Sequence, residues 1–229
     1  MTGRPDAAGA GPAVEVEAVS HRYGRLRPVE VLHDVTLTVA RGELVVLAGR
    51  SGSGKSTLCH LVAGLGRPSA GRIRVAGGPA GDRLDWATLS FLPQRPALVP
   101  ELTVAQNAFL PTRLRGRPDD ADLLAALAVD ALQDKAVGQT SLGEQQRAGI
   151  ARALAVRPVV TVLDEPTGHQ DDDNVERVLA ALLLARGRGS ALVVATHDPR
   201  VTAAADRVVR LRDGRVEPDV EPDGEQREP

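Results

Sequence analysis

The chain has 229 residues, and 42% of them are hydrophobic, which is enough to form a buried core and excludes disorder of the whole chain. Its net charge of -2 excludes an overall positive field for nucleic acid, and its 2% of aromatic residues excludes a surface on which single strands stack. We therefore expect no nucleic-acid partner. The single cysteine, Cys59, excludes an internal disulfide, fits a reducing compartment and is expected in the core.

No segment of the sequence has the pattern of a membrane-targeting or membrane-spanning element. Residues 1–12 are rich in Gly, Ala and Pro and lack the apolar run of a signal peptide. The longest strongly apolar stretch, 178–185, is too short to cross a bilayer. We therefore expect a cytoplasmic protein.

Strands and helices alternate along the chain between two tails, 1–13 and 217–229, which are expected to be disordered. Alternating apolar residues predict half-buried strands over 14–18 and 35–39. Continuous apolar runs predict parallel strands, buried on both faces, over 44–48, 159–163 and 191–195. Helices are expected over 56–63, 119–132, 141–155 and 174–186. This order predicts an α/β fold with a helical segment inserted around residues 97–157.

Residues 49–56, Gly-Arg-Ser-Gly-Ser-Gly-Lys-Ser, match the G-x-x-x-x-G-K-[ST] pattern of a phosphate-binding P-loop between an expected strand and an expected helix. Glycines allow the backbone N–H groups to wrap around phosphate, and the helix N-terminus adds its positive dipole. Lys55 can reach the β- and γ-phosphates, and the Ser56 hydroxyl can ligate Mg²⁺. The residues expected to bind nucleotide here are Gly49, Arg50, Ser51, Gly52, Ser53, Gly54, Lys55, Ser56 and Thr57.

Two carboxylates, Asp164 and Glu165, follow the apolar run 159–163. Parallel sheets place ligands at the carboxyl ends of their strands, so these side chains are expected near the P-loop. One carboxylate can hold Mg²⁺, and the other can orient or deprotonate a water molecule. A further acidic run, 171–173, is interpreted as the first turn of a helix and not as a metal site.

Residues 140–147, Thr-Ser-Leu-Gly-Glu-Gln-Gln-Arg, resemble the signature of ABC-type ATPases, which is usually Leu-Ser-Gly-Gly-Gln followed by Gln-Arg. The segment also contains a capping box, Ser141 with Glu144, and therefore starts a helix. Over residues 14–216 the chain resembles the ATP-binding subunits of the branch that includes lipoprotein-releasing, macrolide-exporting and antimicrobial-peptide-resistance transporters, together with a related cell-division ATPase.

The resemblance implies a P-loop NTPase (RecA-like) core over 14–96 and 158–216, with an antiparallel β subdomain and an inserted helical subdomain over 97–157. It also implies ATP and Mg²⁺ as cofactors and a role for each matching residue. Tyr23 would stack on adenine, Gln94 would contact Mg²⁺ and the attacking water, and His197 would meet the γ-phosphate. The implied catalytic residues are Glu165, His197 and Lys55; the implied Mg²⁺ ligands are Ser56, Gln94 and Asp164.

The same resemblance implies partners. Two chains would pair head to tail, with Ser141, Gly143 and Glu144 of each completing the ATP site of the other and Asp171 at the dimer contact. An integral-membrane permease would dock near residues 94–109 and hold the chain at the inner face of the membrane. The implied function is to bind and hydrolyse ATP and thereby power a membrane transporter of the exporter or lipid- or peptide-extracting type. The alternative function is an ATP-switched dimeric scaffold that regulates a membrane complex without transport. A chromosome or DNA-repair ATPase is disfavoured because the chain has no room for a coiled-coil or zinc insertion.

The sequence also departs from the family pattern. Leu142 replaces the first signature glycine, and Thr140 replaces the usual leucine. His169 and Gln170 replace a small residue and a leucine beside Asp171, so dimer coupling is expected to differ. The segment between Gln94 and Ser141 is shorter than usual, which predicts a trimmed helical subdomain.

Overall fold

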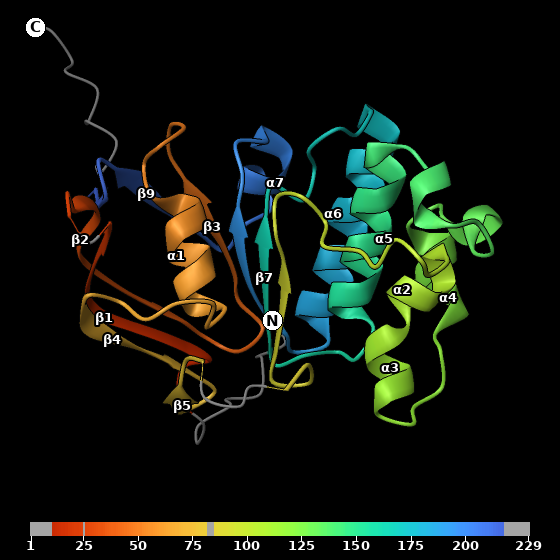
Figure 1. Ribbon diagram of the computed structural model, residues 1–229, viewed down its shortest axis with the longest axis horizontal. Coiled ribbons are helices and arrows are strands. Elements are labelled where there is room, and N and C mark those ends of the chain that lie inside the picture. The colour runs from red at the N-terminus through yellow and green to blue at the C-terminus, as the bar shows by residue number, and fades with distance from the viewer. Residues whose placement is uncertain (1–10, 25, 82–84, 218–229) are drawn as a thin grey trace, which may run out of the picture.

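The computed structural model describes residues 11–24, 26–81 and 85–217 (Figure 1). Most of both expected tails, 1–10 and 218–229, lies outside the described residues. A four-stranded antiparallel sheet has the order β2-β1-β4-β5, and a six-stranded sheet has the order β10-β9-β3-β8-β7-β6. In the second sheet β10 is antiparallel to β9, and the other neighbours are parallel. The α/β class, with its antiparallel β subdomain, is confirmed.

The strands of the antiparallel sheet are β1 (Val14–Tyr23), β2 (Val29–Val39), β4 (Ala70–Val75) and β5 (Gly78–Pro79). Those of the other sheet are β3 (Leu44–Ala48), β6 (Leu89–Leu92), β7 (Val160–Asp164), β8 (Ala191–Ala195), β9 (Arg207–Arg212) and β10 (Arg215–Val216).

All the predicted strands form, and β1 and β2 are longer than their apolar alternation indicated. The prediction missed β4 and β9, in which arginines are interspersed with apolar residues, and the short strands β5, β6 and β10.

The helices are α1 (Lys55–Val62), α2 (Val104–Ala108), α3 (Leu110–Leu114), α4 (Ala121–Ala126), α5 (Leu142–Leu154), α6 (Asp172–Gly187) and α7 (Pro199–Ala203). Helices α2 to α5 fall inside the segment expected to form the helical subdomain. Among the described residues, no helix has the length and apolar character needed to cross a membrane.

The predicted continuous helix over 119–132 is wrong. Helix α4 ends at Ala126, and Ala128 adopts the left-handed conformation with φ +51°. Val129 N–H then donates to the Leu124 carbonyl at 3.0 Å, and both side chains are buried in the same core. A helix end of this kind reverses the chain while it satisfies the last carbonyls. Burial of Val129 therefore prevails over the helical propensity of the Ala/Leu run.

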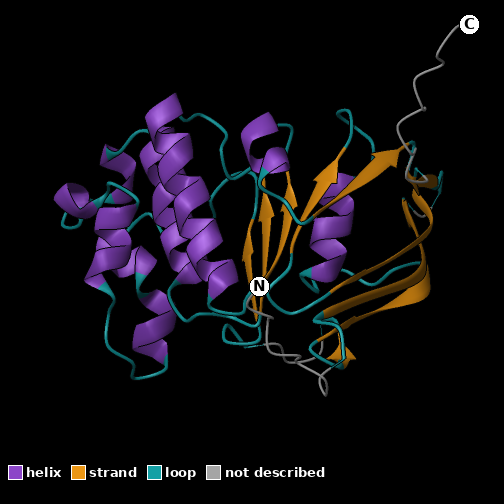
Figure 2. Cartoon of the chain, turned by 180° about the vertical axis from the view of Figure 1, so that it is seen from behind, coloured by secondary structure: helices purple, strands orange, loops and turns teal. Residues whose placement is uncertain are grey.

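Two apolar cores lie on opposite faces of the six-stranded sheet. Figures 1 and 2 show the helices that cover these faces. Helix α1 packs between the two sheets, whereas α5 and α6 cover the far face. In β3, Val45 and Leu47 belong to the first core, while Leu44 and Val46 belong to the second. The unbroken apolar run of this strand thus reflects burial on both faces. Cys59 of α1 is fully buried in the first core, and burial raises the pKa of its thiol well above the usual value.

This arrangement decides where the site lies. Strands β3, β8, β7 and β6 are parallel neighbours, so their carboxyl ends meet at one edge of the sheet. The segments that follow them carry the P-loop, His197, Glu165 and Gln94 respectively. Four segments distant in sequence therefore meet above one edge of the sheet.

Candidate active site

A cleft of about 900 Å³ opens at this edge of the sheet. It brings together the P-loop residues 49–57, Gln94, Glu165 and His197, as the sequence predicted. The lining residues that were not predicted are Val31, Thr167, Gly168, His169, Gln170, Val175, Asp198, Pro199 and Arg200. Tyr23, Asp164, Ser141, Gly143, Glu144 and Asp171 do not line the cleft.

The P-loop backbone takes a path that its glycines permit. Gly49 has φ +149°, and a Cβ on it would lie 2.7 Å from Ser53 Oγ and even closer to the Leu211 carbonyl oxygen. Gly54 caps α1 in the left-handed conformation, with φ +102°. Helix α1 then begins at Lys55, so its unpaired N–H groups and the positive end of its dipole point toward the loop. The site is therefore suited to bind phosphate.

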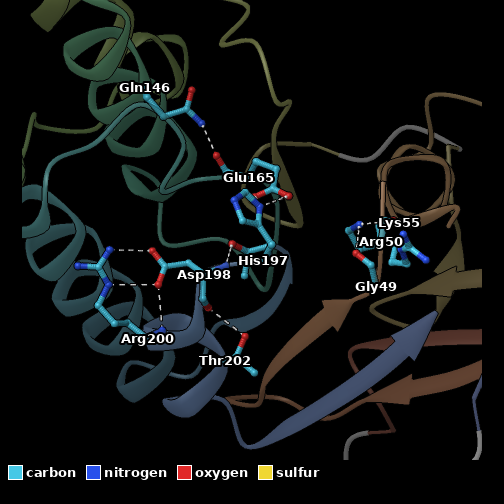
Figure 3. A network of polar contacts seen from close by, with 10 residues as sticks. Gly49, Arg50, Lys55, Gln146, Glu165, His197, Asp198, Arg200 and Thr202 are labelled. Atoms are coloured by element: carbon cyan, nitrogen blue, oxygen red, sulfur yellow. Dashed lines mark hydrogen bonds and ion pairs between the residues drawn. The ribbon is translucent and has the colours of Figure 1, made fainter. Parts of the chain in front are cut away.

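Lys55 is folded over this loop (Figure 3). Its Nζ donates to the carbonyls of Gly49 at 2.7 Å and Arg50 at 3.1 Å. Both acceptors are backbone groups of the loop, so the ammonium stays beside the P-loop. A compact cation at this place provides the charge that phosphate oxygens require.

Glu165 and His197 form a pair across the ends of β7 and β8 (Figure 3). His197 Nδ1 lies 3.1 Å from Glu165 Oε1 and 3.0 Å from Oε2. The Glu165 side chain is only 16% exposed, whereas that of His197 is 83% exposed. Glu165 also has a left-handed backbone, with φ +50°, which is uncommon for a non-glycine residue and is often found at functional sites.

The backbone of Glu165 is fixed from both sides. Its N–H donates to the Ala195 carbonyl of β8 at 2.8 Å, and its carbonyl accepts from Gln146 Nε2 of α5 at 3.1 Å. The strained backbone conformation of Glu165 is therefore stabilised by a bond to strand β8 on one side and by a bond to helix α5 on the other. A carboxylate fixed in this way has the geometry that a general base or water-orienting group requires.

Asp164 lies beneath the cleft and is 2% exposed. Burial raises the pKa of its carboxyl, while the neighbouring Ser56 hydroxyl lowers it. Its Oδ1 has no hydrogen-bond partner among the described residues. A buried carboxylate oxygen without a partner, next to the P-loop serine, fits a hard cation such as Mg²⁺. The part of the chain that the structure describes holds no cluster of three or more His, Cys, Asp or Glu suited to a metal ion.

Tyr23, expected to stack on adenine, stands at the margin of this region. The residue is 49% exposed, and its hydroxyl donates to Thr57 Oγ1 at 3.5 Å. Its ring makes a T-shaped contact with His21, with 4.6 Å between the ring centroids. Tyr23 thus lies beside the P-loop helix and remains exposed.

The signature segment forms the start of α5, as predicted. Ser141 N–H donates to Glu144 Oε2 at 2.7 Å, and Glu144 N–H donates to Ser141 Oγ at 3.3 Å. The backbone N–H of Ser141 holds the pKa of Glu144 below its usual value. Leu142 is the first residue of the helix and is 60% exposed, so this replacement of a glycine leaves a normal helix start. Within its own chain the segment lies outside the cleft.

Asp171 caps α6 by accepting from Asn174 N–H at 2.9 Å, and Asp172 and Asp173 occupy the first helical turn. The interpretation of this acidic run as a helix start is confirmed. Asp171 does not line the cleft of its own chain, which is compatible with the expected role at a contact between chains.

The loop after β8 carries a network that the sequence did not predict. The side chain of Arg200 donates to both oxygens of Asp198, at 3.2 and 3.1 Å, and to Asp172 Oδ1 of α6 at 2.9 Å. Burial raises the pKa of Asp198, but hydrogen bonds from Arg200 hold it below its usual value. The bond to Asp172 joins the His197 loop to the start of α6, and Figure 3 shows the bonds between Arg200 and Asp198. Only the local part, an Asp before Pro199 at a helix start, has a sequence signal.

Comparisons with known proteins identify the family of the chain. The ABC transporter family model matches residues 32–168. The lipoprotein-releasing system ATP-binding protein LolD of Bordetella pertussis is 39% identical over 225 residues, covering 91% of this chain and 97% of that one. The macrolide export ATP-binding/permease protein MacB 1/2 of Paracoccus denitrificans is 40% identical over 90% of this chain, but only over 33% of its own length.

Among solved structures, the dimeric post-hydrolysis state of the ATP-binding cassette MJ0796, bound to ADP and Pi, superposes with a TM-score of 0.82. It is 29% identical and covers 90% of this chain and 97% of its own. The resemblance inferred from the signature segment is confirmed. This chain belongs to the ABC transporter family, as one of its ATP-binding subunits.

Proposed function

We propose that this chain hydrolyses ATP with Mg²⁺, as a head-to-tail dimer, and thereby powers a membrane permease. The observation that carries the proposal is the convergence of the P-loop, Gln94, Glu165 and His197 on one cleft. Glu165 would orient or deprotonate the attacking water, and Lys55 and His197 would stabilise charge on the γ-phosphate. Catalysis of this kind is mainly positioning and electrostatics.

Mg²⁺ would be held by Ser56, Asp164 and Gln94 together with phosphate oxygens. The buried, unpartnered Asp164 Oδ1 supports this assignment. When bound, the cation would neutralise charge on the phosphates. This chain's own contribution is to place a hydroxyl, a carboxylate and an amide around one position.

The start of α5 supports the dimer. Ser141 is exposed at a helix N-terminus, and neither it nor Gly143 or Glu144 lines the cleft of its own chain. A helix N-terminus with free N–H groups is a ready site for phosphate. A second copy paired head to tail would use this helix start, with Asp171 at the contact, and the dimeric MJ0796 cassette supports that arrangement. Adenine would stack on the free face of Tyr23.

A permease would anchor the chain at the inner face of the membrane and dock near residues 94–109. A hollow of about 310 Å³ beside this segment is lined by Trp86, Phe91, Ala97 and Arg152, among others, and offers a place for a partner. The similarity to LolD and MacB supports an exporter, or a transporter that extracts lipids or peptides from the membrane. Such a docking surface would lie next to Gln94. Because Gln94 lines the cleft, a movement of this residue would couple the partner to the nucleotide site.

The test is Glu165→Gln. The amide keeps the shape and still accepts a hydrogen bond, but it cannot take a proton. We expect ATP binding to persist and turnover to fall at least about a hundredfold, the low end for loss of a general base. The matched control is Glu176→Gln, an exposed glutamate of α6, which should hydrolyse ATP at the wild-type rate. An unchanged rate in Glu165→Gln would remove Glu165 from this role.

The same variant tests the partners. With ATP present it should accumulate as a dimer, and affinity purification from gently solubilised membranes should recover a multi-spanning permease in stoichiometric amount. A dimer without any membrane protein would instead favour the ATP-switched scaffold. A variant that stays monomeric with ATP bound would contradict the head-to-tail dimer.

A further inference from the structure

Gln170 bridges the loop that follows Glu165 and the first turns of α5. Its Nε2 donates to the Gly143 carbonyl at 2.9 Å, and its Oε1 accepts from Arg147 Nη1 at 2.7 Å. Both ends of one amide are therefore used on the same helix. A hydrophobic residue of similar size could make neither bond.

The bridge belongs to a larger contact between one face of α5 and the catalytic loop. Gly143, Gln146 and Arg147 are spaced by three and four residues, so they lie on the same face of the helix. Gln146 donates a hydrogen bond to the Glu165 carbonyl, while Gly143 and Arg147 are hydrogen-bonded to the side chain of Gln170. The loop from Glu165 to Gln170 is thus attached to α5 at both of its ends.

Arg147 depends on this bridge. It is 7% exposed, and the bond to Gln170 is the one hydrogen bond of its guanidinium in the described residues, where Nε has no partner. Burial lowers the pKa of Arg147, and the charges of Glu144 and Asp171 oppose that effect. A buried cation is tolerated only when it is paired and hydrogen-bonded. Loss of the Gln170 amide would therefore free Arg147 to move and loosen the start of α5.

We propose that Gln170 is a positioning residue for ATP hydrolysis: its amide fixes the start of α5, with Ser141 and Gly143, relative to Glu165 of the same chain. The inference rests on the proposed function, because in the head-to-tail dimer Ser141 serves the ATP of the partner while Glu165 serves its own. The two ATP sites of the dimer would then share a rigid connection through Gln170.

The first test is Gln170→Leu, with Gln133→Leu as the control, since Gln133 is exposed and its side chain makes no hydrogen bond within the part of the chain described. We expect the turnover number for ATP to fall about tenfold or more, since small misplacements at a site are costly, while KM changes less than about twofold. Affinity of the monomer for ATP should match the wild type, because the P-loop is untouched. Gln170→Glu keeps an acceptor for Arg147 but loses the donor to Gly143. Its turnover number should therefore lie between those of the wild type and Gln170→Leu.

The second test is independent of turnover. Hydrogen exchange of the backbone amides over 142–147 should become faster in Gln170→Leu and stay unchanged over α1. Unchanged exchange at the start of α5 would overturn the proposed bridge. Faster exchange with full turnover would show that the bridge positions nothing. If the wild type itself failed to hydrolyse ATP, the proposed function would fail, and the exchange experiment would still decide whether Gln170 holds α5.

A double-mutant cycle separates positioning from plain stability. In a Gln170→Leu, Arg147→Met pair, the losses in turnover number should be far from additive, because both changes break the same bond. Additive losses, or a loss of turnover that follows the melting temperature alone, would contradict the proposal.

Discussion

Replacing Gly143 by alanine tests whether the start of α5 is pressed against the loop after Glu165. An added Cβ would lie 2.7 Å from the carbonyl oxygen of His169, and real Cβ atoms do not approach that closely. Because the atom it meets belongs to the backbone, side-chain rotation cannot relieve the clash. Either α5 or the loop must shift.

Two effects of opposite sign decide the magnitude. Alanine is favoured over glycine in a helix by up to about 1 kcal/mol. Overpacking a tight contact costs about 1–3 kcal/mol. We therefore expect Gly143→Ala to lower the free energy of unfolding by about 1–2 kcal/mol, and to lower ATP turnover because the shift reaches Glu165.

The control is Gly187→Ala at the end of α6. That position is exposed, and an added Cβ would meet nothing within 4 Å. The free energy of unfolding of this variant should rise by up to about 1 kcal/mol, since only the preference of the helix for alanine over glycine acts. Urea unfolding of the wild type and both variants gives the two differences, and steady-state ATP turnover gives the effect on the site. A Gly143→Ala protein that is stabilised as much as Gly187→Ala and fully active would refute the argument from close packing.

Other predictions follow from single contacts. Lys55→Ala should weaken ATP binding about tenfold or more, the magnitude of a lost charged hydrogen bond, and undiminished affinity in titration calorimetry would exclude its phosphate role. Cys59 should react with a maleimide only after unfolding, because it is fully buried with a raised pKa; rapid labelling of the native chain would contradict that burial. The Arg115 guanidinium, 2.7 Å from Asp85, lowers the pKa of that carboxyl to about 2. Since the folded pKa is depressed, the stabilisation is present above the usual value of 3.8 and disappears as the pH falls toward 2. The free energy of unfolding of the wild type should therefore exceed that of Asp85→Asn by no more than about 1 kcal/mol near neutral pH, because the pair is exposed, and the difference should shrink on acid titration. A difference that is as large at pH 2 as at neutral pH would show that the ion pair is not its source.

The parts of this protein that local chemistry encodes could be predicted from the order of its residues alone. The P-loop is a backbone conformation that needs glycines and a helix start at fixed positions. Its residues can therefore be identified directly from the sequence. The capping box of Ser141 and Glu144 joins residues three apart, and it forms as predicted. The runs of β3, β7 and β8 are apolar at every position because both faces are buried, and that pattern is also local.

The contacts between distant segments, in contrast, depend on how the whole chain folds. Gln170 bonds to Gly143 and Arg147 across a span of more than twenty residues, and Arg200 reaches Asp172 from a different loop. Neither pairing has a fixed spacing, because strand order and helix packing bring these loops together after each has formed. The end of α4 at Ala126 is decided in the same way, since burial of Val129 is a property of the assembled core. The residues that carry the chemistry of the site could thus be identified from the sequence, while packing determined which loops and helices are hydrogen-bonded to one another.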